Sequence, residues 1–78
     1  MDKTILKMLQ ELRPEFDFEN SDDFIEDGYL DSFDITLLTS MLEDEFGIKI
    51  DALDIIPENF SGIGSISTLV AKSGGAKE

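Results

Sequence analysis

The sequence contains no cysteine and no histidine among its 78 residues. The lack of cysteine excludes disulfides, thiolate metal sites and thiol nucleophiles. The lack of histidine removes the commonest general base and the commonest metal ligand. A domain of this size has a small hydrophobic core. Without disulfides or a structural metal, much of its stability must come from helices that form well locally.

Basic side chains are also scarce, with 6 lysines and arginines against 18 acids and a net charge of −12. Such a chain is a poor partner for nucleic acid or an anionic membrane surface, because both require cations. The charge instead favours protein partners with basic patches. Long apolar runs are missing too, so we expect no membrane span, no signal peptide and a cytoplasmic location.

The apolar residues that are present follow helical spacing in several segments. Residues 2–13 form the first expected helix, which Pro14 ends because the residue before a proline avoids the helical region. A second helix is expected from about Ser32 to Phe46. Gly47 follows it and can adopt the left-handed conformation that is common after helices.

The last third of the chain predicts one extended segment and two shorter helices. Residues 48–51 alternate like a strand, but no partner strand is evident, so we expect a loop with buried isoleucines. Residues 57–60 begin with proline, which suits the first turn of a short helix. Ser65 is expected to cap a final helix. The inward-facing residues of that helix are expected to be Ile66, Leu69 and Val70.

A long acidic connection, residues 14–31, separates the first two helices. It carries the large apolar residues Phe16, Phe18, Phe24, Ile25, Tyr29 and Leu30. A structureless loop of this length is uncommon in a compact domain, so we expect these side chains to pin it to the core. The predicted fold class is all-α, a small four-helix bundle of three main helices plus one short helix. We expect residues 1–73 to form the domain and residues 74–78 a flexible C-terminal tail.

The second expected helix carries two apolar stripes instead of one. The stripe expected to face the core is Ile35, Leu38, Leu42 and Phe46. Nearly opposite lie Phe33, Leu37 and Met41, with Asp34, Glu43, Asp44 and Glu45 around them. Exposed apolar area with a charged rim marks an interaction site, so we expect a partner to dock on Phe33, Asp34, Leu37, Met41 and Asp44. The alternative is that the long loop folds over this second stripe.

The entry to this helix reads Gly28-Tyr29-Leu30-Asp31-Ser32-Phe33-Asp34 and places two good helix caps side by side. If Asp31 is the cap, Ser32 is the first helical residue. Its hydroxyl then lies beside free backbone N–H groups, which can hold a phosphate ester. If Ser32 is itself the cap, it needs no chemical role. The local sequence leaves both interpretations open.

Asp31-Ser32-Phe33 at the start of a second helix resembles the Asp-Ser-Leu-type attachment motif of acyl and peptidyl carrier proteins. The similarity continues through residues 42–50, 56–60 and 63–70 and covers nearly the whole chain. It implies that Ser32 bears a covalent 4'-phosphopantetheine arm, which a Mg-dependent phosphopantetheinyl transferase attaches from coenzyme A. By the same resemblance, Asp31 helps to hold the transferase's metal. The arm carries acyl or aminoacyl groups as thioesters.

The resemblance also implies that the protein is not an enzyme but a substrate of other enzymes. Ser32 has no histidine to activate it, so it cannot be the nucleophile of a catalytic triad. The expected protein is a monomer. Its partners are the transferase, an acyl- or aminoacyl-activating enzyme, and the synthases or transferases of one pathway.

Two positions depart from the commonest family pattern. Phe33 stands where leucine is more usual. Phenylalanine also occurs at this position in free-standing carriers such as the D-alanyl carrier protein. Leu37 stands where many fatty-acid carriers have an acid. These departures favour a dedicated polyketide, nonribosomal peptide or aminoacyl pathway over housekeeping fatty-acid synthesis.

Two other function classes fit parts of the sequence. A calcium-binding loop is partly matched by Asp23, Asp27, Gly28 and Asp31. Its third position would be Ile25, which offers no ligand, and its twelfth would be Asp34, which is shorter than the usual bidentate glutamate. A non-carrier adaptor would bind one protein through the outer stripe and would not need Ser32.

Overall fold

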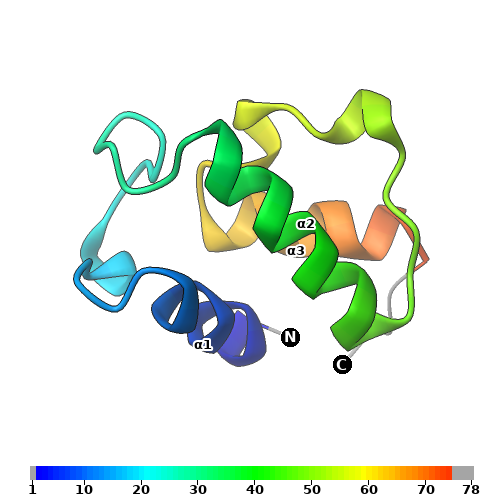
Figure 1. Cartoon of the computed structure of the whole chain (residues 1–78), viewed down its shortest axis with the longest axis horizontal. Coiled ribbons are helices and arrows are strands. Elements are labelled where there is room, and N and C mark those ends of the chain that lie inside the picture. Colours follow the sequence, from blue (N-terminus) through cyan, green and yellow to red (C-terminus); the bar gives the residue numbers. More distant parts are fainter. Residues whose placement is uncertain (1, 75–78) are drawn as a thin grey trace.

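The computed structural model describes residues 2–74 of the chain. Its helical elements in chain order are α1 (Asp2–Leu12), η1 (Phe18–Asn20), α2 (Ser32–Phe46), η2 (Ala52–Asp54), η3 (Pro57–Phe60) and α3 (Ile63–Lys72) (Figure 1). The three η elements are short 3₁₀ turns. Residues 2–74 contain no β-strand, so the expected all-α class is confirmed. Most of the predicted tail, residues 75–78, lies outside the described part.

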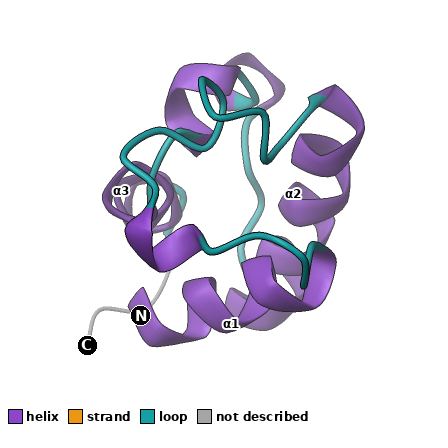
Figure 2. Cartoon of the chain, turned by 90° about the vertical axis from the view of Figure 1, so that its left-hand side faces the viewer, coloured by secondary structure: helices purple, strands orange, loops and turns teal. Residues whose placement is uncertain are grey.

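The three α-helices surround one core. α1 packs against both α2 and α3, and η3 contacts α2 and α3. Figure 1 shows α2 running diagonally in front of α3, with α1 below them. In Figure 2 the helices and loops are arranged around the middle of the molecule. Buried side chains from α1, α2, α3 and the long loop form one cluster. This arrangement leaves the start of α2 at one edge of the molecule, next to the end of the long loop.

Local signals explain the bounds of α1 and α2. In α1 the residues at helical spacing, Ile5, Met8 and Leu9, are buried, and the helix ends before Pro14 as predicted. α2 spans the predicted residues. It begins after the N-cap Asp31 and ends at Gly47, whose left-handed backbone (φ 63°) allows the chain to turn away.

The later part of the chain differs from the prediction in two places. Ser65 does not cap α3, because the helix begins at Ile63 after Gly62, and Ser65 is already its third residue. The helix therefore starts earlier than predicted and has no side-chain cap. The turn η2 was also not predicted. In it the Asp51 carboxylate accepts a hydrogen bond from the Leu53 N–H. In the predicted loop 48–51, Ile50 is buried and Ile48 is partly buried.

The long loop between α1 and α2 is pinned to the core by its aromatic side chains, as predicted. Phe18 and Phe24 are fully buried and meet edge to face at 5.0 Å, and Phe16 stacks on Tyr29 at 4.4 Å. The Phe24 N–H donates to the carbonyl of Ser61, which fastens the loop to the end of η3. The loop is therefore part of the folded structure, and its packing on the core positions the start of α2.

Substitution of two phenylalanines measures how much this packing contributes to the free energy of unfolding. We expect Phe18→Ala to cost about 3–5 kcal/mol of unfolding free energy, because it empties a fully enclosed site. Phe33→Ala is the matched control, since its ring is exposed, and we expect a change within about 0.5 kcal/mol. Urea unfolding followed by circular dichroism measures both. Equal losses for the two variants would contradict the assignment of the loop to the core.

Candidate functional site

The start of α2 is built by a reciprocal pair of hydrogen bonds between Asp31 and Asp34. An Asp31 carboxylate oxygen accepts from the Asp34 backbone N–H at 2.9 Å, and an Asp34 carboxylate oxygen accepts from the Asp31 N–H at 3.3 Å. This capping box satisfies two N–H groups that a helix end otherwise leaves without a partner. It decides between the two interpretations of the entry sequence: Asp31 is the cap, and Ser32 is the first residue of the helix.

Ser32 lies exposed at the amino end of α2. Its backbone carbonyl accepts a hydrogen bond from the Thr36 hydroxyl at 3.0 Å, so the residue belongs to the regular helix. The positive end of a 15-residue helix dipole lies at this point. An accessible hydroxyl in that field suits the attachment of a phosphate ester, because nearby backbone donors and the dipole both favour negative charge.

Asp34 is held by Arg13, which follows directly after α1. The Arg13 Nε lies 3.1 Å from each carboxylate oxygen of Asp34, and one terminal nitrogen lies 3.0 Å from Oδ2. Asp34 is only 3% exposed. Its expected place on the docking face is therefore wrong: a buried carboxylate is retained because a cation pairs with it inside the fold.

Arg13 was not predicted to be a site residue. It is the only arginine in the chain, and it stands 21 residues before its partner. No local pattern connects two residues so far apart. An unusual residue type, one arginine against five lysines, is the only signal that could have drawn attention to it.

The charges at this helix end shift two pKa values in opposite directions. The pKa of Asp31 is lowered, first by the backbone N–H of Asp34 that it accepts and also by the positive charge of Arg13, which together outweigh its partial desolvation. The pKa of Arg13 is raised, mainly by its hydrogen bond to Asp34 and by the charge of that carboxylate. Asp31 is thus held in its ionised form, and its side chain is 66% exposed.

The outer stripe of α2 is open. Phe33 is 69% exposed and Leu37 is 40% exposed, while Met41 is partly buried and packs against the core. The long loop therefore does not fold over this stripe, and that alternative is excluded. Asp44 is exposed, as expected.

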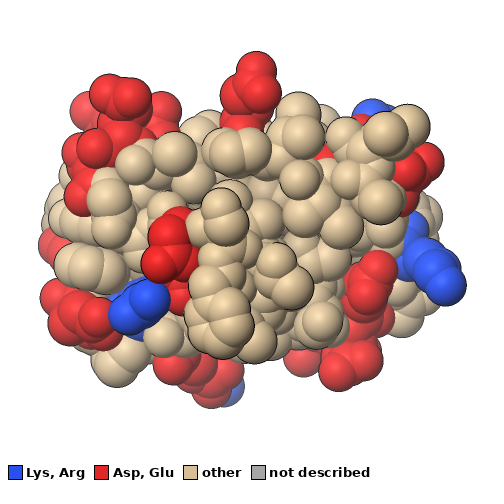
Figure 3. Space-filling view, turned by 45° about the horizontal axis from the view of Figure 1, so that its top comes forward, with Lys and Arg blue, Asp and Glu red and all other residues tan. Residues whose placement is uncertain are grey.

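The segment after α2 also carries exposed apolar side chains. η2 and the residue before η3 expose Leu53 and Ile56, which the sequence analysis did not place on a surface. Figure 3 looks onto α2 and this segment and shows an uncharged central area with acidic side chains around its edge. This view therefore shows a face with few charged side chains at its centre and mostly acidic ones around it.

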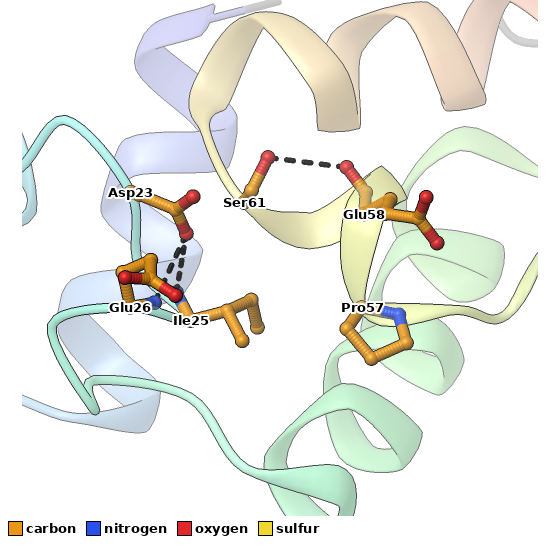
Figure 4. Close-up of a pocket in the computed structure, with 6 residues that line it drawn as sticks. All are labelled: Asp23, Ile25, Glu26, Pro57, Glu58 and Ser61. Atoms are coloured by element: carbon orange, nitrogen blue, oxygen red, sulfur yellow. Dashed lines mark hydrogen bonds between the residues drawn. The ribbon is translucent and has the colours of Figure 1, made fainter.

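A small cavity of about 260 Å³ lies between the long loop and η3. Its lining residues are Asp23, Ile25, Glu26, Pro57, Glu58 and Ser61 (Figure 4). Its carboxylates stand at the sides of the opening in Figure 4, and Ile25 and Pro57 contribute apolar walls. The Ser61 hydroxyl donates to the Glu58 carbonyl, so it is engaged within its own turn.

The aspartates that partly match a calcium loop serve the fold instead. The Asp23 carboxylate accepts from the N–H groups of Ile25 and Glu26, and that of Asp27 accepts from the Ser21 hydroxyl. Asp31 caps α2. Among residues 2–74, no group of three acidic side chains is placed to hold a metal ion. The partial match therefore reflects turns and a helix cap.

The chain matches the family model described as the phosphopantetheine attachment site over residues 3–71. It belongs to this family. The match confirms the resemblance to acyl and peptidyl carrier proteins, whose cofactor is 4'-phosphopantetheine bound covalently to a serine. No curated protein and no solved structure matches the chain.

Carrier domains of this family are substrates of other enzymes and work with phosphopantetheinyl transferases and the enzymes of a pathway. An exposed serine hydroxyl at the amino end of α2 fits such an attached group, because the fold leaves the oxygen accessible. Within residues 2–74, no helix has the length and apolar character that crossing a bilayer requires.

The lowered pKa of Asp31 has a measurable consequence for this carrier's stability. A carboxylate whose pKa is lower in the folded state stabilises the fold above its unfolded-state pKa, near pH 4, and this contribution disappears as the pH falls through the lowered value. Asp31→Asn keeps a good cap but removes the charge. We therefore expect the difference in unfolding free energy between wild type and variant to move in the variant's favour from about pH 5 to about pH 2. Urea unfolding across this range tests it, and a difference that does not vary with pH would contradict it.

Proposed function

We propose that Ser32 is the serine that bears the 4'-phosphopantetheine arm. The observation that supports this most is its place as the exposed first residue of α2, directly after the cap Asp31. Other serines are placed less favourably. Ser21 donates to Asp27, and Ser65, in the first turn of α3, is partly buried with its hydroxyl 3.5 Å from that of Ser61.

In this role the chain supplies the attachment oxygen and the positive electrostatic potential of a helix amino terminus. The arm supplies the group that reacts with the cargo. When bound, the group supplies the thiol that holds acyl or aminoacyl groups as thioesters, which the chain itself lacks because it has no cysteine. Ser32 holds the phosphodiester at the positive end of α2. Asp31, ionised and exposed, is available to the metal of the transferase during attachment.

The partners are proposed to dock on the outer stripe of α2 beside Ser32. The exposed Phe33 and Leu37 form its apolar centre, Met41 lies at its inner edge, and Asp44 is an acid on its rim. Charge complementarity then favours partners with an apolar patch flanked by lysine or arginine. The apolar character at Leu37 supports a dedicated acyl or aminoacyl pathway. The expected cytoplasmic location and monomeric state stay predictions.

Substitution of single serines on α2 tests the attachment site. We expect wild-type protein to gain the mass of one phosphopantetheine when incubated with coenzyme A, Mg²⁺ and a broad-specificity transferase, as read by intact-protein mass spectrometry. Ser32→Ala should show no gain while the helical circular dichroism is kept, because the cap itself is Asp31. Ser40→Ala, an exposed serine further along the same helix, is the matched control and should be modified like wild type.

A mass gain that persists in Ser32→Ala would refute the assignment of this residue. No gain in any of the three proteins would favour the second candidate function, an acidic adaptor that binds one protein through the same apolar face. The open outer stripe is the observation that supports that candidate.

A charge placed on the outer stripe tests docking. We expect Leu37→Glu to raise the KM for the carrier in the transferase reaction by about tenfold, because it removes one exposed apolar anchor and adds a charge that must be desolvated. Thr68→Glu puts the same charge on an exposed position of α3 and should leave KM unchanged. Steady-state kinetics with varied carrier measure both, and equal KM values for the two variants would place docking elsewhere.

A further inference from the structure

We propose that Arg13 is a positioning residue for the modification of Ser32: by pairing with the buried Asp34 it fixes the start of α2, and with it the position of the hydroxyl. The inference rests on the proposed function of Ser32. It concerns a residue at the end of a different helix, which neither the attachment motif nor the family match singles out.

The shortest contacts of the Arg13 guanidinium are all to one carboxylate, that of Asp34. Arg13 makes three contacts of 3.0–3.1 Å with Asp34, whereas its nearest approach to Asp31 is 4.0 Å and to Glu15 is 3.5 Å. Such contacts to both oxygens of a carboxylate hold its plane as well as its charge. Since Arg13 follows α1 directly, the pair also ties the end of α1 to the start of α2.

The Asp34 carboxylate has a second task, because it accepts the Asp31 N–H and so forms half of the capping box. A buried carboxylate without a cation is costly, and it would turn toward water. That movement removes its hydrogen bond to Asp31 and loosens the residue that stands immediately before Ser32. The position of Ser32 therefore depends on Arg13 through the Asp34 carboxylate and the backbone of Asp31.

The same geometry keeps Asp31 free. Arg13 is engaged by Asp34 and stays 4.0 Å from the Asp31 carboxylate, whose side chain remains 66% exposed. A shorter pair with Asp31 would occupy the oxygen that the proposed function leaves available to the transferase's metal. Asp34 thus both orients the helix start and draws the cation away from the residue beside the attachment point.

The reaction to be measured is a phosphoryl substitution without a change of oxidation state. Ser32 Oγ forms a bond to the phosphorus that carries the pantetheine group, and the bond from that phosphorus to the nucleotide part of coenzyme A breaks. The hydroxyl proton passes to a base of the transferase, and the nucleotide part leaves as the bisphosphate. The rate of such a step depends steeply on where the attacking oxygen lies.

The experiment compares Arg13→Ala, Arg13→Lys and wild type with coenzyme A, Mg²⁺ and a broad-specificity transferase, at a temperature where circular dichroism shows each protein folded. For Arg13→Ala we expect kcat to fall roughly 10- to 100-fold, because the hydroxyl is displaced in the bound carrier. KM should change little, since the outer stripe is unaltered. Arg13→Lys should lie between, because lysine keeps the charge but not the planar fork.

Lys72→Ala is the matched control. Lys72 also links two elements by an ion pair, at 2.9 Å to Asp54, but it lies at the end of α3 and has no contact with the capping box. We expect its kcat to equal that of wild type. The control therefore shows whether kcat falls when any ion pair between two elements is lost, or only when the pair that holds Asp34 is lost.

A folded Arg13→Ala protein with wild-type kcat would overturn the inference while leaving Ser32 as the attachment site. If Arg13→Ala does not fold, Arg13→Lys decides, and wild-type kcat in that variant has the same meaning. Failure of the wild-type protein to be modified would instead refute the proposed function, and this inference with it.

Discussion

The structure around the start of α2 depends on one buried carboxylate. Asp34 accepts the Asp31 backbone N–H, pairs with Arg13 and is almost completely enclosed. A helix end needs partners for its free N–H groups, and a buried charge needs a counter-charge. One side chain meets both requirements here, because Oδ2 accepts the Asp31 N–H while both oxygens pair with Arg13. As a result, the position of Ser32 is coupled to the packing of α1 against α2.

The rest of the fold presents this helix end to solvent. α2 buries Ile35, Leu38 and Leu42 on one side and leaves Phe33 and Leu37 open on the other. The aromatic residues of the long loop, which could have covered the open side, instead fill the core between the helices. Because those side chains are used there, the apolar outer stripe of α2 stays open beside Ser32.

The chemistry that the chain lacks agrees with the role of a carrier. It has no thiol and no imidazole. A carrier needs neither, because its thiol belongs to the prosthetic group and its reactions belong to its partners. What the protein must provide is an accessible oxygen in a fixed place and a surface that partners can recognise. The excess of acids costs some stability through self-repulsion within a small domain.

The sequence by itself determined the features that depend on neighbouring residues. The approximate bounds of α2 follow from the candidate caps Asp31 and Ser32 at one end and Gly47 at the other, and α1 ends before Pro14, because caps and breakers act within a few positions. Ser65 shows the limit of such reasoning: it is as good a cap as Asp31, yet the helix begins before it, at Ile63. Only the tertiary structure decided that Asp34 points inward to Arg13 and that the outer stripe stays uncovered. Those outcomes depend on which distant groups meet in the folded chain, and no local pattern carries that information.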